Sequence, residues 1–246
     1  MKTVAIAGCG AIGTLIAQAI EKGVVPCDRL ILYDIDKVKA EKLKETLHVP
    51  AAVAESLDEL IRLKPTVLVE AASQQAARDI VPKAISGNVE LIVMSVGALL
   101  GMNVRSSKIH ICSGAIGGLD AISSADLAGV EEVVLTTRKN PRVLDLDNQA
   151  EKLVYEGGAE EAARRFPREM NVAATLALTV EPGKVRVQVI SDPKVQKNVH
   201  EIRVKWKYGD MFMRFSNDPH PENPKTSALS AWSAIRLLKE ILQSHI

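Results

Sequence analysis

The sequence is poor in aromatic residues, in cysteine and in net charge, and each shortage excludes a class of function. Aromatic residues fill 3% of the 246 positions, too few for the stacking platforms that hold single-stranded nucleic acid. Lysine and arginine number 31 against 30 acidic residues, a formal charge of +1, so the chain has no long-range field to attract nucleic acid or an anionic membrane. We therefore expect a small-molecule partner, with neither nucleic acid nor membrane bound.

Long apolar runs and metal-ligand patterns are also missing. No apolar run reaches the roughly 18 residues that a membrane-spanning helix needs. An apolar stretch near the start is interrupted at Gly8, Gly10 and Gly13, and no small-residue cleavage site follows it, which argues against a signal peptide. The three cysteines form no CxxC pair, and the five histidines have no ligand spacing. These features predict a cytoplasmic protein without a metal site.

Apolar runs alternate with helical patterns in the first part of the chain. Runs typical of buried strands cover residues 3–7, 29–33, 66–70, 90–96 and 109–112, and stretches with apolar residues at helical spacing separate most of them. Strands buried on both faces have continuous apolar runs, and alternation of strand and helix predicts a parallel sheet. We therefore expect a Rossmann-type α/β domain with a doubly wound parallel sheet over residues 1–112.

The pattern changes near residue 113. Apolar and polar residues alternate over residues 133–138, 185–191, 199–206 and 211–216, which is the period of strands with one solvated face. Residues 171–180 predict a buried helix. We expect a second α/β domain with a mixed sheet over residues 113–226. The final segment, residues 227–246, has an apolar helical stripe, and we expect it to pack back on the first domain.

The motif Gly8-x-Gly10-x-x-Gly13 directly follows the first predicted strand and opens a helix. In dinucleotide-binding folds the first glycine permits a tight turn, the second lets the backbone approach a pyrophosphate, and the third lets the helix pack closely on the strand. The helix N-terminus offers unpaired N–H groups to the phosphates. The sequence therefore predicts a dinucleotide site at Gly8, Gly10, Ala11, Ile12 and Gly13.

An acidic residue stands where such a site needs one. Asp34 ends the second predicted strand, about 20 residues beyond the last glycine, which is the spacing of a ribose-binding carboxylate. It favours NAD over NADP, although Lys37 nearby could weaken that preference. Small residues, Ala71, Ala72 and Ser95, follow two later strands and would admit the nicotinamide half of the cofactor. Ordinary small residues at strand ends are an equally good interpretation of these three.

Two histidines are candidates for proton transfer. His200 and His220 lie in polar segments that we expect at loop edges, and a free imidazole titrates near neutrality. Either could also be a bystander. His48 and His245 are expected to be solvated, and His110 to be structural.

Two further features have both a functional and a structural interpretation. The glycine-rich stretch over residues 113–118 could approach the nicotinamide or the substrate closely, or could be a turn between domains. Lys225 could hold a substrate carboxylate, or could be a solvated residue of a rigid, proline-rich connection.

Five segments together resemble the L-aspartate dehydrogenase family over nearly the whole chain. They are GCGAIG, SGAIGGLDAI, FPREMNVAATLAL, NVHEI and PENPKTSALSAWSAI. The resemblance implies NAD(P)-dependent oxidation of L-aspartate to iminoaspartate, which feeds pyridine nucleotide synthesis or hydrolyses to oxaloacetate and ammonia. It also implies a homodimer, with residues 113–226 as the substrate, catalytic and dimerisation domain.

The resemblance also assigns residues to roles. The family's active-site histidine falls on His200, which makes His220 the weaker candidate. The family's cofactor contacts fall on Ala115 and Asn171. Because the substrate carries two carboxylates, we further expect substrate contacts from Asn198, from Lys225 and from the backbone of residues 113–118.

Two alternatives remain open. A homoserine dehydrogenase-like or dihydrodipicolinate reductase-like enzyme would keep the architecture and change the substrate. A protein that senses NAD(H) without chemistry would need an output module such as a basic helix-turn-helix, and the balanced charge argues against one.

Overall fold

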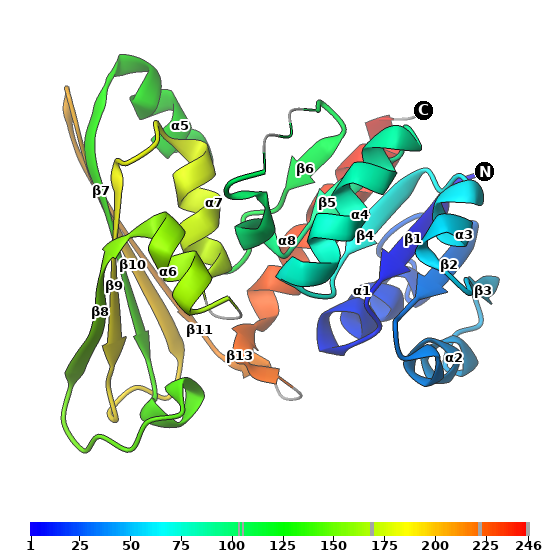
Figure 1. The fold of residues 1–246 in the computed structure, drawn as a ribbon, viewed down its shortest axis with the longest axis horizontal. Coiled ribbons are helices and arrows are strands. Elements are labelled where there is room, and N and C mark those ends of the chain that lie inside the picture. Colours follow the sequence, from blue (N-terminus) through cyan, green and yellow to red (C-terminus); the bar gives the residue numbers. More distant parts are fainter. Residues whose placement is uncertain (103, 105, 168–169, 221–222, 245–246) are drawn as a thin grey trace. The chain divides into compact units, whose positions relative to one another are not determined.

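The computed structural model describes residues 1–102, 104, 106–167, 170–220 and 223–244, and of residues 219–220, 223–226 and 244 the backbone alone. The chain divides into two compact units (Figure 1). The first unit joins Met1–Cys112 to Ser230–Ile246, and the second unit is Ser113–Leu229.

The first unit contains a six-stranded sheet with the order β3-β2-β1-β4-β5-β6. Its strands are β1 (Thr3–Ala7), β2 (Arg29–Tyr33), β3 (Ala51–Val53), β4 (Val67–Glu70), β5 (Glu90–Val93) and β6 (Ile109–Ile111). Every neighbouring pair is parallel. This is the strand order of a Rossmann fold, which confirms the predicted doubly wound sheet.

Helices cover both faces of this sheet. They are α1 (Ala11–Glu21), α2 (Lys37–Glu45), α3 (Leu57–Arg62), α4 (Gln74–Ser86) and α8 (Ala228–Ser244), with a 3₁₀ turn η1 at Val96–Leu99. Val4 and Ile6 pack with α1, α2 and α8, whereas α3 and α4 contact each other and the sheet. All five residues of β1 are buried, which is why the strand has a continuous apolar run.

The second unit contains a mixed five-stranded sheet with the order β11-β10-β7-β9-β8. The strands are β7 (Val130–Lys139), β8 (Lys152–Gly158), β9 (Val185–Ser191), β10 (Asn198–Trp206) and β11 (Gly209–Asn217). The β7–β9 pair is parallel and the other pairs are antiparallel, so the predicted mixed sheet is confirmed. A small ladder pairs β12 (Pro219–His220) with β13 (Asn223–Ser227), and η2 is a 3₁₀ turn at Pro141–Leu144.

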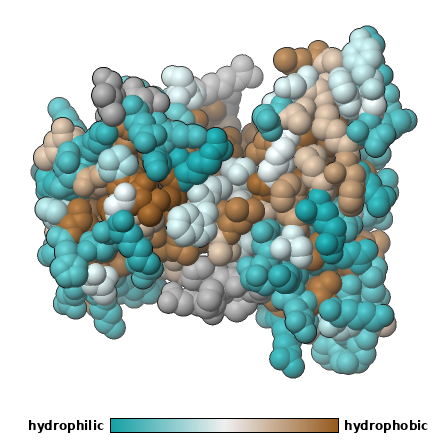
Figure 2. Space-filling view, turned by 180° about the vertical axis from the view of Figure 1, so that it is seen from behind, coloured by the Kyte–Doolittle hydropathy of each residue, from teal (hydrophilic) through white to brown (hydrophobic). Residues whose placement is uncertain are grey.

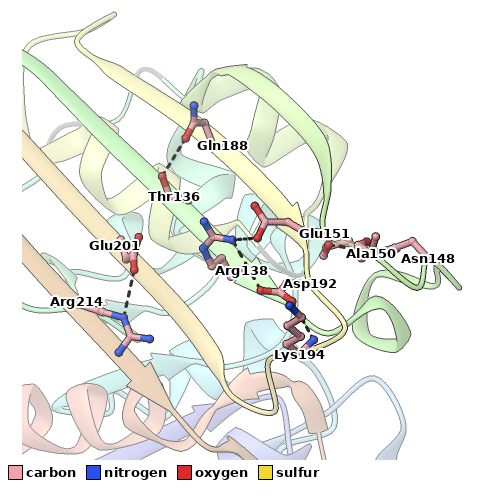
Figure 3. Close-up of polar contacts among 11 residues, drawn as sticks. Thr136, Arg138, Asn148, Ala150, Glu151, Gln188, Asp192, Lys194, Glu201 and Arg214 are labelled. Atoms are coloured by element: carbon pink, nitrogen blue, oxygen red, sulfur yellow. Dashed lines mark hydrogen bonds and ion pairs between the residues drawn. The ribbon is translucent and has the colours of Figure 1, made fainter.

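One face of this sheet is covered by α5 (Leu119–Ala128), α6 (Ala159–Arg165) and α7 (Asn171–Thr179), as Figure 1 shows. Leu135, Val187 and Ile202 face these helices in one apolar core. Residues that alternate with them form polar pairs on the other face (Figure 3): Thr136 donates to Gln188 at 3.1 Å, and Arg214 donates to Glu201 at 3.2 Å.

The sequence did not predict α5, β8 or α6. In α5, Ser123 and Ser124 both donate to the carbonyl oxygen of Asp120, and serine competes with the backbone in this way in non-helical conformations too. Strand β8 ends in Gly157 and Gly158, and glycine weakens a strand pattern. Helix α6 has seven residues. Each of these elements depends more on its contacts within the folded unit than on a helix or strand pattern in its own sequence.

Within the part of the chain that the structure describes, no helix is long and apolar enough to cross a membrane. Hydrophilic residues cover much of the surface that Figure 2 shows.

Candidate active site

The turn between β1 and α1 can be made only with glycine at two positions. Gly8 has φ +103°, and a Cβ atom there would lie 2.5 Å from the carbonyl oxygen of Ala71. A Cβ atom on Gly13 would lie 1.9 Å from the carbonyl oxygen of Gly8. The first glycine therefore brings the turn against the end of β4, and the third lets α1 pack on the turn.

Gly10 has a different reason to be glycine. Its φ is −79°, which any residue adopts, and a Cβ atom there would meet nothing within 4 Å. It is the N-cap of α1, and no side chain caps this helix end. Open space thus lies over the N-terminus of a helix whose first N–H groups have no side-chain acceptor at the N-cap. Both features fit the pyrophosphate of a dinucleotide.

Asp34 is fixed against this turn. Its Oδ2 accepts the Cys9 N–H at 2.7 Å, and its Oδ1 accepts the Asp36 N–H at 2.9 Å. A carboxylate has about four lone-pair sites, so each oxygen can still accept a ribose hydroxyl. Burial and the charge of Asp34 raise the pKa of the Cys9 thiol to about 12, so the thiol stays protonated near neutrality and is a poor nucleophile.

Lys37 is directed to a different acid. Its Nζ lies 2.5 Å from Oε1 of Glu55, and this hydrogen bond raises the pKa of Lys37. Because Glu55 already neutralises Lys37, the lysine is less available to the additional phosphate of NADP. Both side chains are more than half exposed, so the pair adds little to the stability of the fold.

A buried glutamate, which the sequence did not single out, joins the predicted nicotinamide residues. Glu70 ends β4 and is fully buried. Its Oε1 accepts the Ala72 N–H and the Ser95 hydroxyl, both at 2.9 Å. Its Oε2 accepts the N–H groups of Ser95 at 2.8 Å and of Met94 at 3.2 Å. Glu70 therefore ties together the carboxyl ends of β4 and β5. Burial raises the pKa of this carboxyl.

His200 lies in the strand predicted over residues 199–206, but it is buried and does not have the polar setting at a loop edge that the sequence suggested. It is the third residue of β10 and is 2% exposed. Ile202 and Val204, which share its face of the strand, belong to the apolar core, and they draw the segment into the sheet. Thr137 lies opposite on β7, and its hydroxyl oxygen is 3.0 Å from Nδ1 of His200.

His200 belongs to a buried polar cluster on the helix-facing side of the sheet. Thr137 and Lys139 are two residues apart on β7, and Asn198 and His200 are two residues apart on β10. Asn198 donates to the hydroxyl of Ser227 at 3.5 Å. The cluster is Thr137, Lys139, Asn198, His200 and Ser227, each at most 3% exposed. Sequence reasoning missed Thr137 and Lys139, because a lysine that ends a strand normally reaches solvent.

The pKa of His200 is lowered to about 3. Burial is the larger cause, and the charge of Lys139 adds to it. The imidazole is therefore neutral near pH 7, which is the state that can accept a proton.

The remaining predicted residues lie on other elements of the second unit. Ala115 is buried in the loop before α5, and its carbonyl oxygen accepts from Nδ2 of Asn217 at 3.0 Å. Asn171 is the first residue of α7. The side chains of Lys225 and His220 lie outside the described residues. Among the side chains that are described, no group of three or more histidine, cysteine and acidic residues could hold a metal ion.

The glycine turn, its acid and the strand order define an NAD(P)-dependent oxidoreductase of the Rossmann class. Residues 8–111 match the family model described as homoserine dehydrogenase, NAD binding domain, and residues 120–241 match that of aspartate dehydrogenase, C-terminal. An L-aspartate dehydrogenase of Methanothermobacter thermautotrophicus is 40% identical, with 99% of this chain and 97% of the relative covered. One of Archaeoglobus fulgidus is 38% identical, with 99% of each covered.

This chain belongs to the L-aspartate dehydrogenase family, which confirms the resemblance seen in the sequence. Solved structures agree. The crystal structure of an aspartate dehydrogenase of Thermotoga maritima has a TM-score of 0.76 at 27% identity, covering 100% of this chain and 98% of that one. A myo-inositol dehydrogenase of Lactobacillus casei has a TM-score of 0.59 at 12% identity, covering 99% and 87%, which shows a shared fold alone.

Proposed function

We propose that this chain catalyses the NAD(P)-dependent oxidation of L-aspartate to iminoaspartate, which then hydrolyses to oxaloacetate and ammonia or feeds NAD biosynthesis. Its relatives over nearly the full length are L-aspartate dehydrogenases. The observation that carries the chemistry is the buried imidazole of His200 with Nδ1 beside the Thr137 hydroxyl.

The cofactor would be held by the residues that the sequence and the family resemblance assign to it. The residues of the glycine turn would bind the pyrophosphate: Gly8, Gly10, Ala11, Ile12 and Gly13. Asp34 would accept the ribose hydroxyls, with NAD preferred. The nicotinamide half would contact Ala71, Ala72, Ser95, Ala115 and Asn171. When bound, the dinucleotide supplies the acceptor for the hydride that leaves Cα of aspartate.

His200 would act on the substrate nitrogen. When Nδ1–H donates to the Thr137 hydroxyl oxygen, Nε2 carries the lone pair that a base needs. That nitrogen would take one proton from the substrate ammonium, so that the amine electron pair can form the C=N bond as the hydride leaves. His200 could later activate the water that attacks the imine. Asn198 and Lys225 would contact the substrate.

We further propose a cytoplasmic homodimer that binds neither nucleic acid nor membrane. The family resemblance supports the dimer, and the second unit would form its interface. The cysteines support a reducing compartment, because none of Cys9, Cys27 and Cys112, all described by the structure, forms a disulfide.

The test is a panel of L-amino acids offered with NAD and with NADP, followed by the absorbance of the reduced nicotinamide. We expect reduction with L-aspartate, and faster reduction with NAD. Homoserine belongs in the panel because the first unit matches a homoserine dehydrogenase model. Reduction by homoserine alone would favour that enzyme class. NAD binding without reduction by any amino acid would favour a sensing protein and overturn the proposal.

A further inference from the structure

Lys139 is a buried lysine to which the reaction above gives no role. It is the last residue of β7 and is 2% exposed. Its carbonyl oxygen accepts the Asp192 N–H at 2.9 Å, and its backbone pairs with Ser191 of β9. The backbone is therefore fixed against the end of β9, and the side chain projects from a rigid position in the sheet.

Strand alternation separates Lys139 from the cation beside it. The side chain of Arg138 lies on the other face of the sheet, where its Nη1 is 2.7 Å from Oε2 of Glu151 and 3.8 Å from Oδ2 of Asp192 (Figure 3). Lys139 has the same parity in β7 as Thr137 and Leu135, so it faces the side that carries His200. The two adjacent cations therefore lie on opposite faces of the sheet, and Lys139 lies on the face that carries His200.

The charge of Lys139 lowers the pKa of His200, after the larger effect of burial. A positive charge must be close to disfavour the imidazolium in this way. Thr137 lies opposite His200, so Lys139, two residues further along β7, is a diagonal neighbour of His200, about 7–8 Å away across the two strands. The long lysine side chain spans part of that distance, so a substrate with an amino group and a carboxylate on one carbon can contact both side chains.

We propose that Lys139 binds one carboxylate of a dicarboxylic amino-acid substrate and thereby positions the substrate amino group at His200. This inference rests on the proposed function. Lysine ammonium groups form strong, charge-assisted hydrogen bonds to carboxylates. The bound carboxylate also offsets the charge that disfavours the imidazolium, so the pKa of His200 rises when substrate binds. His200 thus becomes a stronger base only when there is a proton to remove.

The variant Lys139→Met tests this, because methionine keeps most of the length and removes the charge. Lys205→Met is the matched control: Lys205 is in the same sheet, its side chain is 71% exposed, and it pairs with Glu131 at 3.0 Å. Calorimetry with succinate, a dicarboxylate without an amino group, measures binding to the NAD-loaded protein. We expect Lys139→Met to raise the Kd of succinate and the KM of L-aspartate by about 10- to 100-fold, as for loss of a hydrogen bond to a charged group.

The Kd of NAD should not change in Lys139→Met, Lys139→Arg should recover part of the succinate affinity, and Lys205→Met should behave as wild type. A wild-type protein that does not bind succinate, or a folded Lys139→Met that binds it as tightly, overturns the inference. Should Lys139→Met fail to fold, NMR titration of His200 in wild type decides: succinate must raise its pKa. Absence of aspartate oxidation by a wild type that binds succinate through Lys139 would overturn the proposed function alone.

Discussion

Thr137 and His200 face each other across β7 and β10, with the threonine hydroxyl oxygen 3.0 Å from Nδ1 of the imidazole and both side chains buried. A hydrogen bond at one ring nitrogen fixes both the orientation of the ring and the tautomer. The pairing of β7 with β10 therefore fixes the orientation of the His200 ring, which is the base in the proposed reaction.

Thr137→Val should lower kcat for L-aspartate by about 10-fold, because valine keeps the shape and leaves Nδ1 without its partner. Thr137→Ser should restore most of the loss, since it keeps a hydroxyl group. The Kd of NAD, measured by calorimetry, should be unchanged in both. Equal kcat values in wild type and Thr137→Val would show that the contact does not position the ring.

His200→Ala should lower turnover by about 10²–10⁴-fold, the usual contribution of a general base. NAD should still bind, because the glycine turn and Asp34 are on the other unit. The control is His48→Ala, whose side chain is 94% exposed and which should keep full turnover. Unchanged turnover in His200→Ala would remove its catalytic role.

His200 should also make the protein sensitive to acid. The unfolded chain binds a proton at His200 as the pH falls through 6.5, whereas the folded protein keeps the ring neutral until about pH 3. The unfolded state binds more protons in this window, so the free energy of unfolding falls as the pH is lowered. Urea denaturation of wild type and His200→Gln at matched pH values should show a flatter profile for the variant. Parallel profiles would contradict the lowered pKa.

Asp34→Ala should weaken the binding of NAD more than that of NADP. The Kd of NAD should rise by about 10-fold or more, because the change removes a charged acceptor for the ribose hydroxyls. Glu55→Gln is the companion variant: it removes the carboxylate that Lys37 contacts and should improve NADP binding while NAD binding stays the same. Fluorescence titration with each dinucleotide gives the ratio. An unaltered NAD-to-NADP ratio in Asp34→Ala would count against the ribose contact.

Glu70→Gln should destabilise the protein by about 2 kcal/mol, although it removes a buried charge. Both glutamate oxygens accept from donors, and a glutamine amide presents its own N–H groups to two of them. Buried donors left without an acceptor cost about 1–3 kcal/mol. Chemical denaturation measures the stability, and NAD binding should weaken as the ends of β4 and β5 loosen. A variant as stable as wild type would contradict this account.

The first sheet could be predicted closely because its strands are buried on both faces and so have continuous apolar runs. The run over residues 29–33 became β2 without change. The glycine turn could be predicted because the backbone around Gly8 and Gly13 leaves no room for a side chain.

The cluster around His200 could not be predicted in the same way. The end of β7, Arg138-Lys139, has the composition of a solvated strand end, and only its pairing with β9 and β10 buries the lysine. Glu70 could not be identified either, because most of its hydrogen bonds come from Met94 and Ser95, more than 20 residues away. Whether a charged residue is buried depends on its partners in the tertiary structure, and the hydrophobic periodicity of the sequence does not identify those partners.

The bond from the Cys9 N–H to the Asp34 carboxylate has a consequence for the energetics of nucleotide capture. It joins the pyrophosphate turn to the ribose acceptor before any nucleotide arrives. Because this corner is already ordered, less conformational entropy is lost when the nucleotide binds. The empty and occupied forms of this corner should therefore superimpose, and affinity can be high without a rearranging loop.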